Sequence, residues 1–443
     1  MNQIAKFFRF DERETNFKTE IIAGLTTFMT MAYVLAVQPS AMVGFGEMPS
    51  MIDVNGVLIS KEAIMIMVAI TTGLFTFVMA IYANLPFAIS TGMGSNFLLG
   101  TLVQSGAYSF AAIMTITFLG GLLFTIFTIL GVREAVSKIM PKNIKIAMGT
   151  AIGFFVAYLG FKNTGIGVYV NGIGRGDFTQ PTVYLAILGL LIIAILSALK
   201  VKGAILYGIL GITFLGIPFG VTKIPAEIFS VPSFSDVKNV VFQFNISELF
   251  NAEAFILIFT IFTSDFFGTM GTILGLTGKA GMLDENGNFE GMEKPFLVDA
   301  VGTMMGGMLG CTNISTYVES SAGIEAGGRT GFTAIVTGIL FILTIFIAPL
   351  AVVIPDIATG PALIYVGFLM ISGIKNVDLT DLTDAFGPFV MIMFTIFCGS
   401  IAAGIAAGLL GFVIIKTFTG KAKEVHPFMY FTSIILVLYF IYG

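Results

Sequence analysis

Long apolar runs recur along this chain and limit the folds that it can adopt. Clear examples are 110–130, 183–199 and 332–354. Each is about 20 residues long, enough for a helix to cross a hydrocarbon core of about 30 Å. Only 11% of the 443 residues are charged, against about 25% in soluble domains. The runs also lack the one-sided apolar stripe of helices in soluble proteins. The sequence therefore predicts an all-α polytopic membrane protein rather than a large soluble helical one.

The N-terminal residues and the cysteines fit this class. Residues 2–20 are charged, so we expect no cleavable signal, and the apolar segment that follows is expected to stay as a first span. Cys311 and Cys398 both lie in apolar surroundings and imply no disulfide framework. The formal charge of −4 gives no reason to expect a nucleic-acid partner.

The hydrophobic segments number about 14, with one more at the C-terminus. They are 17–38, 62–82, 87–103, 109–131, 144–162, 181–199, 203–221, 251–276, 295–312, 314–326, 331–354, 360–374, 385–397 and 399–418, followed by 427–442. The third and tenth, 87–103 and 314–326, are interrupted by Gly, Ser and Thr. Short interrupted segments in matching places are typical of the broken helices of transporters.

Four short matches link the two halves of the chain in the same order. They pair 89–91 with 314–316, 110–115 with 332–337, 160–163 with 373–376, and 208–211 with 408–411. A constant order with similar offsets indicates an internal duplication. Since each half holds an odd number of spans, the second half must be inverted. The sequence thus predicts a 7+7 inverted-repeat transporter fold.

Charge placement gives an independent test of this topology. With a cytoplasmic N-terminus, positive charges collect on the cytoplasmic side, as the positive-inside rule requires. Only five of the 22 lysines and arginines fall outside, namely Lys61, Lys162, Arg175, Lys223 and Lys238. Segment 427–442 is left as either an additional span or a helix on the cytoplasmic face.

Two carboxylates lie at membrane depth, where ionisable groups are rare and usually functional. Asp265 lies about midway along the eighth span, and Glu319 lies in the broken tenth span. The alternative for each is a structural hydrogen-bond acceptor inside the bundle. Asp299 follows Pro295 by four residues and is expected near the inner end of the ninth span. There, a structural cap or ion pair is as good an interpretation as function.

The broken third span carries Asn96 within Gly92-Met93-Gly94-Ser95-Asn96. Glycines let the backbone approach a ligand, and a half-helix that begins at the midplane offers free N–H donors. The Asn96 amide adds a donor and an acceptor, although it would also serve as a cap of the half-helix.

Carboxylates suit the edge of a planar base, because they accept from ring N–H groups and exocyclic amines. Two carboxylates that face one cavity would repel, so at least one should carry a proton or neighbour a cation. This gives a physical basis for coupling to a cation. An anion transporter or channel on the same fold should have no such acids at its site. A membrane-embedded enzyme is disfavoured, since the one histidine is His426 and no metal-ligand or Ser-His spacing occurs.

At these motifs the sequence resembles the nucleobase:cation symporter-2 family, in its AzgA-like branch of hypoxanthine, guanine and adenine permeases. The resemblance spans essentially the whole chain, and the motif around Glu319 matches this branch rather than the uracil and xanthine branches. The stretches that carry it are 19–33, 92–96, 265–272, 316–320, 327–331 and 424–427.

The resemblance implies a core domain of spans 1–4 and 8–11 that moves against a gate domain of spans 5–7 and 12–14. The ranges are a cytoplasmic tail 1–16, core 17–132 and 250–354, gate 142–221 and 360–420, and a C-terminal hydrophobic segment 425–443. Carried onto this chain, the binding positions are Asn96, Asp265 and Glu319, with Thr269 and Ser320 beside them.

Ion coupling is assigned to Asp265, Glu319 and Asp299. The branch usually has a second acid three residues after the first, where this chain has Gly268. The implied function is uptake of a purine base across the inner membrane by symport with H⁺, with Na⁺ as the alternative ion and no cofactor. Alternatives are uracil, xanthine or a small anion on the same fold. Lipid is the expected environment, and a homodimer is left open.

Overall fold

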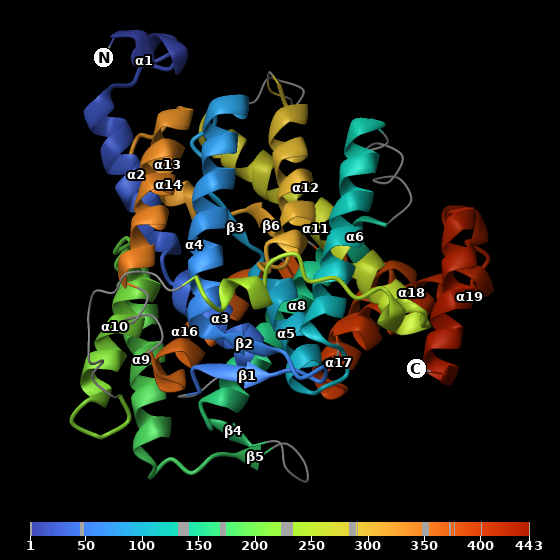
Figure 1. Ribbon diagram of the computed structural model, residues 1–443. Coiled ribbons are helices and arrows are strands. Elements are labelled where there is room, and N and C mark those ends of the chain that lie inside the picture. The colour runs from blue at the N-terminus through green and yellow to red at the C-terminus, as the bar shows by residue number, and fades with distance from the viewer. Residues whose placement is uncertain are drawn as a thin grey trace.

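The computed structural model describes residues 2–44, 48–131, 141–168, 174–222, 234–282, 289, 291–347, 354–371, 374–375, 377–399 and 401–442. Helices make up most of this part of the chain (Figure 1). Many begin at a side-chain cap, because the first N–H groups of a helix have no partner within it. Asn16, Ser60, Ser109, Asn251 and Thr330 cap α2, α4, α6, α11 and α14 in this way.

The elements of the two halves have the following bounds. The first half contains α1 Asn2–Phe7, α2 Phe17–Met31, α3 Val34–Val43, β1 Ser50–Ile52, β2 Leu58–Ser60, α4 Lys61–Val78, η1 Met79–Ala83, β3 Ile89–Thr91, α5 Met93–Gln104, α6 Phe110–Ile129, α8 Lys142–Asn163, β4 Gly167–Val168, β5 Gly174–Arg175, α9 Pro181–Ala198 and α10 Ala204–Gly216. The second half contains η2 Val237–Asn239, η3 Ser247–Leu249, α11 Ala252–Lys279, α12 Glu293–Met308, β6 Ile314–Thr316, α13 Ser320–Glu325, α14 Gly331–Leu343, η4 Thr344–Ile347, α16 Asp356–Ile371, α17 Leu382–Phe397, α18 Ile401–Phe418, η6 Ala422–Glu424 and α19 Pro427–Tyr442.

The two predicted broken helices are confirmed, and they meet each other. Each consists of a short strand followed by a half-helix: β3 leads to α5, and β6 leads towards α13. β3 and β6 pair antiparallel between α4 and α12, with Ile89 opposite Thr316, Ser90 opposite Ser315 and Thr91 opposite Ile314 (Figure 1). Both strands read Ile-Ser-Thr, so the pairing is symmetric about the two serines. The matched tripeptides of the internal repeat therefore cross at one point.

Helix lengths vary as this architecture requires. In the part of the chain described here, four helical stretches are long and apolar enough to cross a membrane alone: Phe17–Val43, Lys61–Ala83, Phe110–Ile129 and Pro181–Ala198. The first joins α2 and α3 and runs past the predicted end at residue 38. The non-helical strands β3 and β6 pack on α4 and α12 and pair with each other, which satisfies backbone polar groups away from lipid.

The helices pack in two groups. α14 packs on α2 and α4, while α12 and α11 pack on α6. In the other group α16 packs on α8 and α9, and α17 packs on α18 and α8. Glycines permit the close approach of α8 and α16, since a Cβ at Gly160 would lie 2.8 Å from the carbonyl oxygen of Gly360. The division into core and gate domains, and movement between them, stay predictions.

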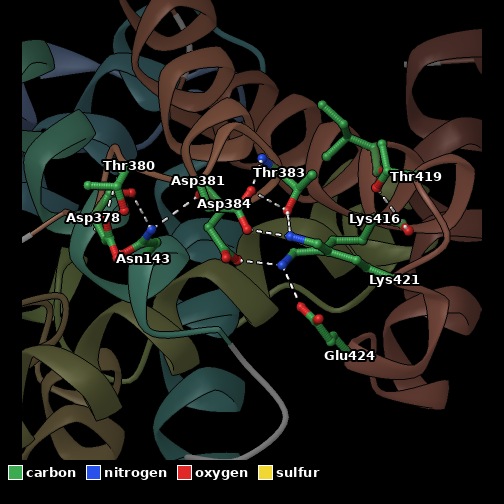
Figure 2. Close-up of polar contacts among 11 residues, drawn as sticks. Asn143, Asp378, Thr380, Asp381, Thr383, Asp384, Lys416, Thr419, Lys421 and Glu424 are labelled. Carbon is green, nitrogen blue, oxygen red and sulfur yellow. Dashed lines mark hydrogen bonds and ion pairs between the residues drawn. The ribbon is translucent and has the colours of Figure 1, made fainter.

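Figure 2 shows a set of ion pairs where α17 begins and α18 ends. Lys416 Nζ lies 2.9 Å from Asp384 Oδ1 and 2.6 Å from Glu424 Oε2, and Lys421 bonds Asp381, the residue that caps α17. We call Asp381, Asp384, Lys416, Lys421 and Glu424 the lysine cluster. It joins the beginning of α17 and the end of α18 to the segment that leads into α19. α19, the C-terminal hydrophobic segment, then packs along α18 and α11.

Candidate substrate site

Asp265 lies on α11 beside the strand crossing, and its carboxylate contacts neutral side chains. The Thr303 hydroxyl of α12 donates to Asp265 Oδ2, and Asn313 Nδ2 donates to Asp265 Oδ1 at 3.3 Å. Thr303 also contacts both the N–H and the carbonyl oxygen of Ile314, at 3.2 and 2.8 Å. Asp265 is thus linked through one hydroxyl to strand β6. Among the described residues, no cation contacts this carboxylate.

Asp299, on α12, is held by a similar set of neutral donors. Thr269, four residues after Asp265, donates to Asp299 Oδ2 at 2.7 Å. Thr316 of β6 donates to Asp299 through its N–H at 2.9 Å and its hydroxyl at 2.7 Å. Asp299, in the second turn of α12, is therefore bonded to the strand crossing. Its predicted place near the inner end of the span stays a prediction.

Glu319 precedes α13 at the opposite end of β6 from Asn313. Its backbone occupies the N-cap position, but its side chain makes no cap hydrogen bond. Instead the Tyr33 hydroxyl, between α2 and α3, donates to Glu319 Oε1 at 2.8 Å. Among the described residues, Tyr33 is the one other residue whose side chain donates to this carboxylate, so an acceptor position is left for a base with N–H donors.

Asn96 lies in the first turn of α5 and is fully buried. The cap position belongs to Gly92, so the interpretation of Asn96 as a helix cap is excluded. Its Oδ1 contacts the Thr312 hydroxyl. Thr312 has a φ of +60°, a left-handed conformation that is uncommon for a β-branched residue and that clusters at functional sites.

The other two predicted substrate-binding residues, Ser320 and Thr269, make hydrogen bonds within the protein. Ser320 Oγ accepts from the Ala88 N–H at 3.0 Å and so fixes the chain leading into β3. The Thr269 hydroxyl is taken by Asp299. Both residues are buried beside the site, and their contact with a substrate stays a prediction.

The crossing brings Asn96 and Asp265 together through the consecutive residues Thr312 and Asn313. Glu319 follows β6 at its other end, and no described hydrogen bond joins it to Asp265. Sequence reasoning missed Tyr33, Thr303 and Asn313. Only Tyr33 carried a signal, because it ends the first of the stretches that carry the family resemblance.

Two further features border the site. A Cβ at Gly268, where the branch has its second acid, would meet no described atom within 4 Å. An open pocket of about 530 Å³ lies apart from the carboxylates, between the ends of α3 and α5 and Asn163 at the end of α8. It therefore lies between the two helix groups.

Paired half-helices at an antiparallel strand crossing, with buried carboxylates beside them, define an inverted-repeat membrane transporter. Solved structures share the fold: the transmembrane domain of a cyanobacterium bicarbonate transporter, BicA, gives a TM-score of 0.62 at 15% identity, covering 89% of this chain and 97% of that one. Murine Slc26a9, an anion transporter, gives 0.62 at 12% identity, covering 91% and 69%.

The sequence profile of the permease family matches residues 18–408. The chain belongs to this family, the nucleobase:cation symporter-2 permeases, and is a transporter rather than an enzyme. The guanine/hypoxanthine permease PbuG of Bacillus subtilis is 34% identical over 98% of this chain and 99% of its own length. The adenine permease AdeP of Escherichia coli is 34% identical, over 98% and 95%. The resemblance inferred from the motifs is confirmed.

Proposed function

We propose that this protein takes up purine nucleobases, namely hypoxanthine, guanine and adenine, by symport with a cation. H⁺ is the proposed ion. The names of the relatives, guanine/hypoxanthine and adenine permeases, support the substrate class. The anion transporters share only the fold, at 12–15% identity, so their substrates carry no weight here.

The observation that carries the proposal is the neutral surroundings of the buried carboxylates. Asp265 is 4% exposed and Asp299 is fully buried, and both receive hydrogen bonds from hydroxyl, amide and backbone N–H donors. A charged carboxylate at membrane depth is costly, and neutral donors offset only part of that cost. A proton on one carboxylate would relieve its repulsion of the other, which could then accept from the N–H donors of a base. Binding of the proton would thus favour binding of the base, and the reverse.

We assign different parts to the acids. Glu319 holds the base through the oxygen that Tyr33 leaves free, and Asp265 contacts the base and responds to the coupling ion. Asp299 takes part in coupling through β6, to which it is bonded. Each proton that moves down 100 mV supplies about 2.3 kcal/mol, enough for roughly fifty-fold accumulation.

The proposed location is the inner membrane, with the N-terminus in the cytoplasm. Arg13 bonds the Arg329 carbonyl oxygen, and Lys279 pairs with Glu325. Positive charges from both halves therefore gather at the end of the molecule where α1 lies, which supports this orientation under the positive-inside rule. A homodimer in the membrane stays a proposal.

The test is uptake of radiolabelled hypoxanthine, uracil and sulfate by cells that lack their own carriers and express this protein. Hypoxanthine should accumulate and be displaced by guanine and adenine. A collapsed proton gradient should abolish the accumulation. Preferred uptake of uracil, or of sulfate, would replace the proposal with another nucleobase or with an anion.

A further inference from the structure

Asn313 lies immediately before β6 and between two residues of the candidate site. Its backbone carbonyl oxygen accepts from the Gly92 N–H at 2.9 Å, at the start of α5. Its Nδ2 donates to Asp265 Oδ1 at 3.3 Å. A Cβ on Gly92 would lie 2.3 Å from this nitrogen, so only glycine lets α5 approach so closely. The side chain is 3% exposed.

The contact with Asp265 fixes which way the Asn313 amide points. Only its NH₂ end can donate to a carboxylate, and a reversed amide would put two acceptor oxygens together. While Asp265 is ionised, Oδ1 therefore points away from it. Among the described residues, this buried oxygen has no hydrogen-bond partner. A buried acceptor without a partner costs free energy and calls for an explanation.

Asn96 provides the complementary atom. Its Oδ1 faces the Thr312 hydroxyl, and its Nδ2 is buried with no partner in the described part of the chain. Because Thr312 and Asn313 are consecutive, the free acceptor (Asn313 Oδ1) and the free donor (Asn96 Nδ2) lie on either side of the same short segment. Purine bases carry such edges: N–H beside C=O in hypoxanthine and guanine, and NH₂ beside a ring nitrogen in adenine.

We propose that Asn313 is a specificity-determining residue whose Oδ1 accepts a hydrogen bond from one N–H of the purine. Asn96 donates to the neighbouring acceptor of the base, and Asp265 keeps the Asn313 amide in the right orientation. The inference rests on the proposed function, since the ligand is a purine. The left-handed Thr312 holds Asn313 at this point, and its own hydroxyl lies between Asn96 Oδ1 and the Cys311 carbonyl oxygen.

The test is a set of inhibition constants for hypoxanthine uptake in cells that express wild type, Asn313→Ala or Asn313→Thr. The competitors are hypoxanthine itself and hypoxanthines methylated in turn at each ring N–H. Asn313→Ala should weaken hypoxanthine roughly 2- to 10-fold, the range for one neutral hydrogen bond. For the derivative whose contacted N–H is already methylated, the substitution should have no effect. Asn313→Thr keeps an oxygen near the strand and tests the same point if the alanine variant does not reach the membrane.

The matched control is Thr260→Val. Its hydroxyl is also buried without a partner among the described residues, but it lies five residues before Asp265, roughly 140° around α11. Its constants should equal those of wild type. Weakening by one common factor for every competitor would show that Asn313 acts only through the position of Asp265. That result, or unchanged constants, overturns the inference. A wild type that carries no purine would instead overturn the proposed function itself.

Discussion

The carboxylates of the strand crossing and those of the lysine cluster meet different partners. Asp265 accepts hydrogen bonds from Thr303 and Asn313, which are both neutral and buried. In the lysine cluster, Asp384 is held by the buried Lys416, and Asp381 by Lys421 (Figure 2). A lysine partner keeps a carboxylate charged, and the pair stays as it is. A hydroxyl partner accommodates either protonation state, because it can donate or accept.

We therefore expect changes in protonation at the strand crossing and not at the lysine cluster. The crossing joins both halves of the repeat, so a change in charge there reaches β3 and β6 together. The lysine cluster joins α17, α18 and the segment before α19 within one helix group, where a fixed charge serves stability. Substitutions in the two regions should therefore give different kinds of defect.

The largest effect is expected for Glu319→Gln. Glutamine keeps the acceptor for Tyr33 but places donors against the N–H donors of the base. Binding should fall roughly 10- to 100-fold, the range for hydrogen bonds to charged groups. Inhibition constants in membrane vesicles measure it. Glu325→Gln, six residues on and paired with the exposed Lys279, is the control and should stay within twofold of wild type.

A smaller effect on selectivity is expected for Gly268→Asp. A Cβ at this position would meet no described atom within 4 Å, so we expect the fold to be kept. A second acid one turn after Asp265 should change the ratio of adenine to hypoxanthine affinity roughly 3- to 10-fold, by one added hydrogen bond to the base. Competition assays give the ratio, and Gly268→Asn separates charge from size. An unchanged ratio in Gly268→Asp would place Gly268 outside the site.

Lys416→Met should affect stability and not affinity. The Lys416 side chain is 1% exposed, while Asp384 and Glu424 are 36% and 56% exposed. Water therefore solvates the carboxylates left behind, and the cost should be about 1–2 kcal/mol rather than that of a fully buried pair. The melting temperature in detergent should fall by about 1–2 °C. Lys423→Met, at an exposed neighbour, should leave it unchanged, and a loss of hypoxanthine affinity in Lys416→Met would contradict the division of roles.

The smallest effect concerns pH. The hydrogen bond from Lys421 holds the pKa of the Asp381 carboxyl well below its usual range. Because the folded pKa is lowered, this pair stabilises above the unfolded value of about 4 and loses that effect only as pH falls through the folded value. From pH 5 to 8, the difference in melting temperature between wild type and Lys421→Met should therefore be constant. Uptake should change with pH over the same window. A difference in stability that follows the uptake profile would link the cluster to coupling.

The sequence predicted the broken helices because Gly, Ser and Thr interrupt the third and tenth apolar segments. The Ile-Ser-Thr tripeptides, which match between the two halves, pair with each other in the structure. It also predicted two carboxylates at membrane depth, Asp265 and Glu319, from their apolar surroundings, and Asp265 is buried. The partners were out of reach: Tyr33 and Glu319 are 286 residues apart, and Thr303 is an ordinary threonine until packing brings it to Asp265. The contacts of Asp299 were out of reach for the same reason, since Thr316 of β6 meets it only in the folded chain.

The most direct test of the difference between the two regions is transport by Asp265→Asn and Asp384→Asn in proteoliposomes. Counterflow reports exchange of hypoxanthine without a driving ion, and uptake under a pH gradient reports coupling. Asp265→Asn should retain some counterflow and lose all accumulation against the gradient, because its site no longer takes a proton. Asp384→Asn should retain both activities. Accumulation of hypoxanthine by Asp265→Asn to the wild-type level, or its loss in a folded Asp384→Asn protein, would contradict the account.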